Sequence, residues 1–184
     1  MRLTKKGEYA LRTLIRLGIA EREGKGVTSV SSLAEQERLP FKFLEAILFE
    51  LRGAGYVESL RGKHGGARLA KPMKTIKMGE VVRLIDGKLA PIGCASETEY
   101  EPCTCPDEVH CGLRMLMIDV RNAIANILDR YTLEHVVEVT MRKQEREAAA
   151  LKAGAKKKAA KKATARHADP ADGFLAMLLE TKSA

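Results

Sequence analysis

Tryptophan is absent from this 184-residue sequence, aromatic residues make up only 4% of it, and no cysteine occurs outside the window from Cys94 to Cys111. Charged residues interrupt every apolar stretch, so we expect neither a membrane-spanning helix nor a secretory signal, and the cytoplasm is the predicted location. Cytoplasmic thiols stay reduced, which disfavours structural disulfides for the four cysteines. An apolar content of 45% is enough to form a buried core.

Charges of opposite sign separate along the chain. Residues 1–72 carry fourteen basic and eight acidic side chains, residues 73–147 carry ten and thirteen, and residues 148–184 carry eight and three. A basic N-terminal region suits contact with a polyanion, whereas the acidic middle region does not. The last region is mostly alanine and lysine up to Ala168, which is typical of a flexible basic tail that adds nonspecific affinity for DNA.

Apolar residues at helical spacing predict three helices in the first region. Their expected bounds are Thr4 to Glu23, Thr28 to Arg38, and Pro40 to Gly53. Two short strands, 56–60 and 67–70, flank a turn that contains three glycines. This order of elements is that of a winged helix-turn-helix domain. In such a domain the third helix enters the major groove of DNA, and the hairpin, called the wing, contacts the backbone or the minor groove.

The expected DNA contacts come from polar and charged side chains of these elements. A wing that brings its backbone close to phosphates needs glycines, and its basic side chains can neutralise charge or enter a narrow minor groove. The candidates are Thr28 and Ser29 at the start of the second helix, Lys42 and Glu45 on the third, and Arg61, Lys63, His64 and Arg68 on the wing.

Three further helices are predicted after the wing. A short amphipathic helix spans Met78 to Asp86, and a last helix follows Thr132, with order expected to end near Arg146. Between them, apolar residues from Leu113 to Tyr131 alternate at spacings of four and three, which predicts a long helix with one narrow seam. We expect the seam to join two copies of the chain, since a homodimer presents two recognition helices to a palindromic site. Packing on its own domain is the alternative.

The cysteines share one loop with five acidic residues and two prolines. Clustered thiolates indicate a metal or iron–sulfur site. Two alternatives stay open: a closed structural zinc site made by all four cysteines, and a metal-free thiol switch that forms disulfides on oxidation. An enzyme is not expected, because no nucleophile is paired with a base and no glycine-rich nucleotide loop follows a strand.

Several short motifs resemble the IscR, NsrR and RirA family of winged-helix regulators. The similarity covers roughly residues 1–143. The motifs are Phe43-Leu44-Glu45, Leu60-Arg61-Gly62 with Gly65-Gly66, Met78-Gly79-Glu80-Val81, and the cysteines before the long helix. The resemblance implies a homodimeric, DNA-binding transcriptional regulator, acting as a repressor. It also implies that DNA affinity depends on an iron–sulfur cluster, 2Fe-2S or 4Fe-4S, which senses iron, nitric oxide or redox state.

The resemblance also implies a set of cluster ligands. Cys94, Cys105 and Cys111 match the family's three loop cysteines, although ten residues separate the first two and Cys103 is an additional thiol between them. Whether Cys103 or Cys105 is the middle ligand stays open. Where one branch of the family has a histidine ligand this chain has Arg114, and in other branches an acidic residue at the position of Glu8 is the fourth ligand.

The sequence therefore predicts a mainly α-helical protein with a small β-wing. A winged helix-turn-helix DNA-binding domain spans residues 1–72. The cysteine sensor loop and the dimerisation helices span residues 73–147, and a basic flexible tail spans residues 148–184.

Overall fold

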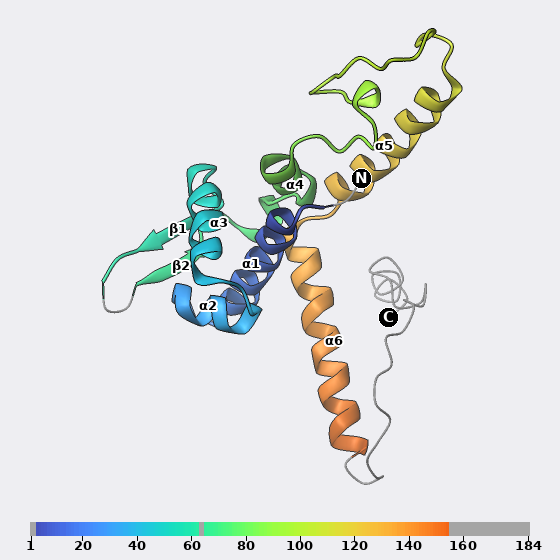
Figure 1. Cartoon of the computed structure of the whole chain (residues 1–184). Coiled ribbons are helices and arrows are strands. Elements are labelled where there is room, and N and C mark those ends of the chain that lie inside the picture. Colours follow the sequence, from blue (N-terminus) through green and yellow to red (C-terminus); the bar gives the residue numbers. More distant parts are fainter. Residues whose placement is uncertain (1–2, 63–64, 155–184) are drawn as a thin grey trace. The chain divides into compact units, whose positions relative to one another are not determined.

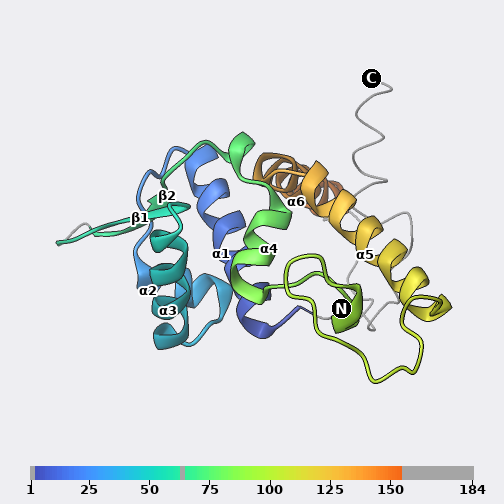
Figure 2. The same ribbon diagram turned by 90° about the horizontal axis from the view of Figure 1, so that it is seen from above.

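The computed structural model describes residues 3–62 and 65–154. Within these residues the fold consists of helices and one two-stranded antiparallel sheet, so the predicted mainly helical class with a small β-wing is confirmed. No helix of the described ranges is long and apolar enough to cross a membrane. The elements in Figures 1 and 2 are α1 (Lys5–Arg22), α2 (Val30–Glu37), α3 (Phe41–Gly53), β1 (Val57–Leu60), β2 (Gly66–Leu69), the 3-10 turns η1 (Met73–Thr75) and η2 (Gly93–Ala95), α4 (Met78–Asp86), α5 (Gly112–Arg130) and α6 (Leu133–Gly154).

Side-chain caps fix the starts of the first two helices. The backbone N–H of Gly7 donates to Thr4 Oγ1 at 3.0 Å, and that of Ser32 donates to Ser29 Oγ at 3.2 Å. Such bonds satisfy N–H groups that have no partner within the helix. Both helix starts agree with the sequence prediction. The third helix differs slightly, because Pro40 is its N-cap residue and the helix begins at Phe41.

The core of the N-terminal domain lies between α1, α2 and α3. The helices contribute apolar side chains at the spacing that predicted them, and burial of such side chains is the main force that holds the helices together. The fully buried members are Leu14, Leu33, Leu44, Ile47 and Leu51.

The wing is joined to the start of α2. Its strands pair from Val57 with Leu69 to Leu60 with Gly66. Thr28 then forms an isolated bridge with Ala67 through backbone bonds of 3.0 and 2.8 Å. A Cβ atom at Gly66 would collide with the carbonyl of Thr28, so this close approach requires glycine.

Helix α4 lies between α1 and the cysteine loop (Figures 1 and 2). Its last residue, Asp86, accepts hydrogen bonds from the backbone N–H and the hydroxyl of Thr4, at 2.9 and 2.5 Å. Arg83 donates two bonds of 2.7 Å to the carboxylate of Asp129 on α5. Helix α4 is therefore tied by side chains to both the start of α1 and the end of α5.

The chain divides into two units, residues 1–134 and 135–184, and α6 begins in the first and continues in the second. The expected end of order near Arg146 is wrong, because α6 runs on to Gly154. Residues 148–154 are mostly alanine with a single charged residue, Lys152, and the high helix propensity of alanine extends the helix through them. The rest of the predicted tail, residues 155–184, lies outside the described residues.

Candidate DNA interface and cysteine loop

The outward face of α3 carries both of the candidate residues expected on that helix. The side chain of Lys42 is 91% exposed and that of Glu45 is 46% exposed, and the Lys42 ammonium lies 3.2 Å from the Glu45 carboxylate. The buried residues of α3 lie on the opposite face. Because an exposed ion pair of this kind contributes little to stability, both groups are available to a ligand at low cost.

The two candidates at the start of α2 differ in what they offer. Ser29 is exposed, and its hydroxyl caps the helix and lies 3.2 Å from that of Ser31. The hydroxyl oxygen of Thr28 is buried and has no hydrogen-bond partner among the described residues. Thr28 thus contributes its backbone to the wing, whereas Ser29 and the helix N-terminus face solvent, where backbone N–H groups favour an anion such as phosphate.

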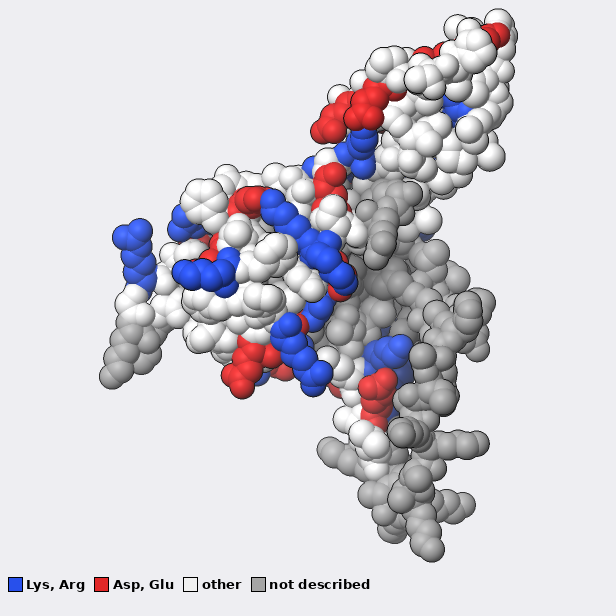
Figure 3. All heavy atoms as spheres, in the orientation of Figure 1, with Lys and Arg blue, Asp and Glu red and all other residues white. Residues whose placement is uncertain are grey.

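The wing presents one basic side chain that has no ion pair within the described ranges. Arg61 is exposed and precedes Gly62, whose φ of +107° is strained for residues other than glycine. Arg68, in contrast, lies opposite Glu58 in the strand register and pairs with its carboxylate. Lys63 and His64, the other wing candidates, lie outside the described residues. Figure 3 shows Lys and Arg side chains spread over the helical body and the wing.

The four cysteines come together in the loop between α4 and α5. Cys94 is buried in η2, Cys103 and Cys111 are half-buried, Cys105 is exposed, and all four thiols are free. Cys103 lies close enough to Cys94 and Cys105, and Cys111 close enough to Cys105, to alter the acidity of these thiols. The four thiols are therefore neighbours in one segment, which runs from η2 to the residue before α5.

These contacts change the acidity of two thiols. The hydrogen bond with Cys103 is the main factor that raises the pKa of Cys105 to about 11, and repulsion between the neighbouring thiolates adds to it. Burial raises the pKa of Cys94, and Cys103 adds to that shift. Thiols so close together keep their protons unless a cation compensates the charge of the thiolates.

The thiols of this loop are donors of the type that both iron–sulfur clusters and structural zinc sites use. Within the described ranges, no three His, Cys, Asp or Glu side chains converge on one point that could hold a metal ion. A structural zinc site needs four donors around one centre, whereas a cluster distributes its thiolate ligands over several iron atoms. If a cluster binds here, Cys94, Cys111 and either Cys103 or Cys105 are the thiols that would hold it, and the cluster would supply redox and ligand-exchange chemistry.

Glu8, the expected fourth ligand, is engaged elsewhere on α1. Its carboxylate lies 2.8 Å from the Lys5 ammonium and 3.6 Å from the Arg12 guanidinium. The hydrogen bond with Lys5, together with both positive charges, lowers the pKa of Glu8. Among the described residues, none of its ion pairs reaches the cysteine loop.

Two arginines of α5 support the loop, and sequence reasoning missed their role. Arg114 donates to the carbonyl of Cys94 at 2.9 Å, and Arg121 donates to that of Ala95 at 2.8 Å. Arg114 also lies 3.3 Å from the Glu108 carboxylate. The spacing of seven residues places both arginines on one face of α5, which is the sequence signal that indicates a shared role. They satisfy carbonyls that the loop leaves without strand or helix partners.

Known proteins match most of the chain. Residues 3–139 match the model of the Rrf2 family, described as an iron-dependent transcriptional regulator. An rrf2-like HTH-type transcriptional regulator of Rhodobacter capsulatus is 37% identical over 137 residues, which are 73% of this chain and 91% of that protein.

Two solved structures share the fold. The structure of CymR, the global cysteine regulator of Bacillus subtilis, matches with a TM-score of 0.62 and 30% sequence identity. The match covers 75% of this chain and 97% of the CymR chain. IscR of T. potens has a TM-score of 0.57 and 28% identity, and it covers 80% and 90% of the two chains. The family match over most of the length, the winged helix and the preserved order of elements agree, and the chain belongs to the Rrf2 family of transcriptional regulators.

Proposed function

We propose that this DNA-binding regulator acts as a homodimeric repressor whose affinity for a palindromic operator depends on an iron–sulfur cluster in the cysteine loop. The observation that supports this most is that all four cysteines of the sequence lie free in one loop, where neighbouring thiols raise the pKa of Cys94 and Cys105. The description of the family as iron-dependent agrees with a cofactor that contains iron. The function is one of binding rather than catalysis, and the cytoplasm, where the operator lies, is the proposed location.

Exposure of α5 supports the homodimer. None of its 19 residues is buried, although the helix has an apolar seam. An apolar seam that stays exposed to water along a whole helix is unusual for a monomer. A second copy of the chain, related by a two-fold axis, would cover it. The exposed members of the seam are Leu113 at 58%, Val120 at 36% and Ile127 at 50%.

Direct contacts connect the cysteine loop with the helix-turn-helix. The loop follows Asp86, which is bonded to Thr4 at the start of α1. On α1, Arg12 and Arg16 donate to opposite oxygens of Glu37 at 3.0 and 2.9 Å, at the end of α2. A cluster that is lost or modified would release the loop, and the displaced end of α4 would shift α1 and the helix-turn-helix.

A thiol switch is the second candidate, because the same contacts favour it. Cys94 lies near Cys103 and Cys105 lies near Cys111, so oxidation can join these thiols as disulfides once the loop brings their sulfur atoms together. Since the sequence has no other cysteine, each thiol-dependent effect can be assigned to this loop.

Anaerobic purification separates these candidates. We expect brown protein that contains iron and acid-labile sulfide and that binds its operator differently after the cluster is removed by a chelator. Colourless protein with one zinc per chain would point to the structural zinc site. Metal-free protein that holds the operator equally before and after cluster reconstitution would refute control by a cluster, and a response to oxidant alone would identify the thiol switch.

A further inference from the structure

Phenylalanine is concentrated on the exposed side of α3. The sequence has four phenylalanines, and Phe41, Phe43 and Phe49 all lie on this helix with 44%, 37% and 67% of their surface exposed. Aromatic side chains normally supply buried area to a core. Here Tyr56 is the aromatic residue among the buried side chains of the described core, and the three phenylalanine rings lie outside it on the helix that is expected to enter the major groove.

Among these rings, Phe49 is the most exposed, and no aromatic ring of the described residues packs against it. Phe43 packs edge-on against Tyr9 at a centroid distance of 5.7 Å. Phe49 follows Lys42 by seven residues and Ala46 by three, so the three side chains share the outward face of the helix. The guanidinium of Arg52 lies 5.4 Å from the centroid of the Phe49 ring, which restrains the ring in an exposed position.

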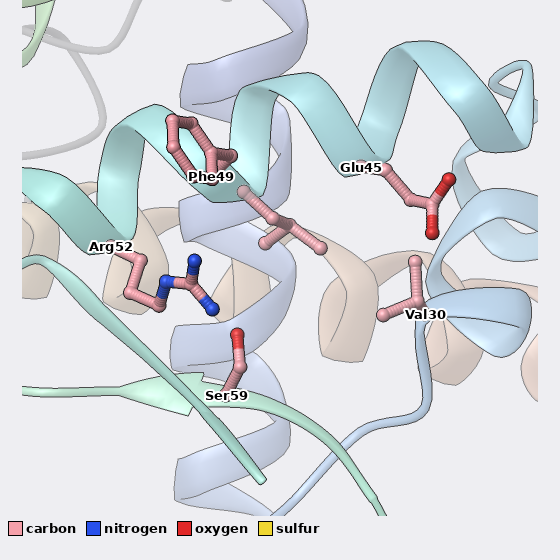
Figure 4. Close-up of a pocket in the computed structure, with 6 residues that line it drawn as sticks. Val30, Glu45, Phe49, Arg52 and Ser59 are labelled. Carbon is pink, nitrogen blue, oxygen red and sulfur yellow. The ribbon is translucent and has the colours of Figure 1, made fainter. Parts of the chain in front are cut away.

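An open hollow of about 300 Å³ lies beside this ring (Figure 4). It is bounded by α2, α3 and β1, and its lining residues are Val30, Glu45, Leu48, Phe49, Arg52 and Ser59. Figure 4 shows the Arg52 guanidinium directed toward Ser59 and the Glu45 carboxylate near Val30. The hollow is thus apolar in its middle and charged at its ends, with a cation that makes no ion pair among the described residues.

Double-stranded DNA is the ligand that this surface fits best. The N-terminus of α2 with Ser29, and the wing with Arg61, flank α3. Each suits a phosphate, and Arg61 has no ion pair with another described residue. In the major groove, the 5-methyl group of thymine is the apolar feature that a side chain can read. Ala46, one turn before Phe49, is small enough to allow a base edge to approach the ring.

We propose that Phe49 determines operator specificity by packing its ring against the 5-methyl group of a thymine in each half-site, while Arg52 contacts a neighbouring phosphate. This proposal rests on the proposed binding of a palindromic operator. The proposal gives Phe49 a role in base recognition. It also explains why a large apolar ring is exposed to water, which is energetically unfavourable.

The test begins with duplexes selected from a random library by the full-length protein. In the best duplex, each thymine is replaced in turn by deoxyuridine, which removes only the methyl group. Replacement of the contacted thymine in one half-site should lower affinity about fourfold. Replacement of the contacted thymines in both half-sites should lower it about fifteenfold. The Phe49→Ala variant should bind the thymine and deoxyuridine duplexes equally, whereas Phe41→Ala, the matched control on the same helix, should retain the difference.

Each result is decisive. Equal binding of both duplexes by the unaltered protein, or methyl discrimination that survives in Phe49→Ala, overturns the role of Phe49 while DNA binding itself stands. Failure to enrich any duplex contradicts the proposed function instead. Phe49→Leu keeps an apolar side chain on a good helix former, and partial discrimination by this variant, with unchanged circular dichroism, separates methyl recognition from misfolding.

Discussion

Replacement of Ile127 by alanine should weaken the homodimer about thirtyfold. Ile127 lies on the apolar seam of α5 and is 50% exposed. Full burial of an isoleucine stabilises by about 1.5–3 kcal/mol, so covering the exposed half contributes about 1 kcal/mol for each copy. Two-fold symmetry doubles this to about 2 kcal/mol, which corresponds to about a thirtyfold increase in the dissociation constant of the dimer.

Sedimentation velocity over a concentration series measures that constant. Met115→Ala is the matched control, because Met115 is 53% exposed but lies on the face of α5 opposite the seam. Operator binding should lose affinity in parallel with dimerisation, since one protomer presents a single recognition helix. Equal dissociation constants for the unaltered protein and Ile127→Ala, or equal effects of the two substitutions, would refute α5 as the dimer interface.

Three other predictions concern the cysteine loop, the wing and the link between α4 and α5. Cys105→Ala should abolish the visible absorption of anaerobically purified protein; a spectrum like that of the unaltered protein would exclude Cys105 as a ligand. Arg61→Ala should weaken operator binding by about 1–3 kcal/mol in a titration, and Arg68→Ala by less because Arg68 already pairs with Glu58. The hydrogen bonds from Arg83 lower the pKa of Asp129, so its stabilising contribution is present above the unfolded pKa and is lost as pH falls through the lower folded value. Both side chains are more than a third exposed, so the contribution is less than about 1 kcal/mol. Urea unfolding at pH 5 and pH 3 measures it: the free energy of unfolding should change less between the two pH values in Arg83→Gln than in the unaltered protein. The same pH dependence in both proteins would contradict the assignment.

Local interactions account for the parts of the fold that the sequence predicts correctly. Thr4 and Ser29 cap helices through bonds to N–H groups three residues ahead, and such bonds depend only on neighbouring residues. Glycine in the wing likewise marks a turn that few other residues can adopt. The element order and the apolar seam of α5 follow from spacing alone.

Interactions between distant segments explain what the sequence does not reveal. Thr28 has the sequence pattern of a solvent-facing helix cap, yet its pairing with Ala67, 39 positions later, buries the hydroxyl. Arg121 resembles any basic residue on an exposed helix, and only the path of the loop brings the carbonyl of Ala95 to it. The roles of these residues depend on tertiary structure, which spacing does not encode.

The energetic cost of using Glu8 as a cluster ligand is small. Glu8 would give up ion pairs with Lys5 and Arg12, and because all three side chains are at least 38% exposed, water screens both pairs and they contribute little to stability. Arg12 also donates to Glu37, whose side chain is only 11% exposed, so that bond is shielded from water and is harder to break. Release of Glu8 from Arg12 therefore leaves α1 attached to the end of α2. A displacement of the first turn of α1 would then move the helix-turn-helix rather than detach it, as regulation of DNA affinity from the cysteine loop requires.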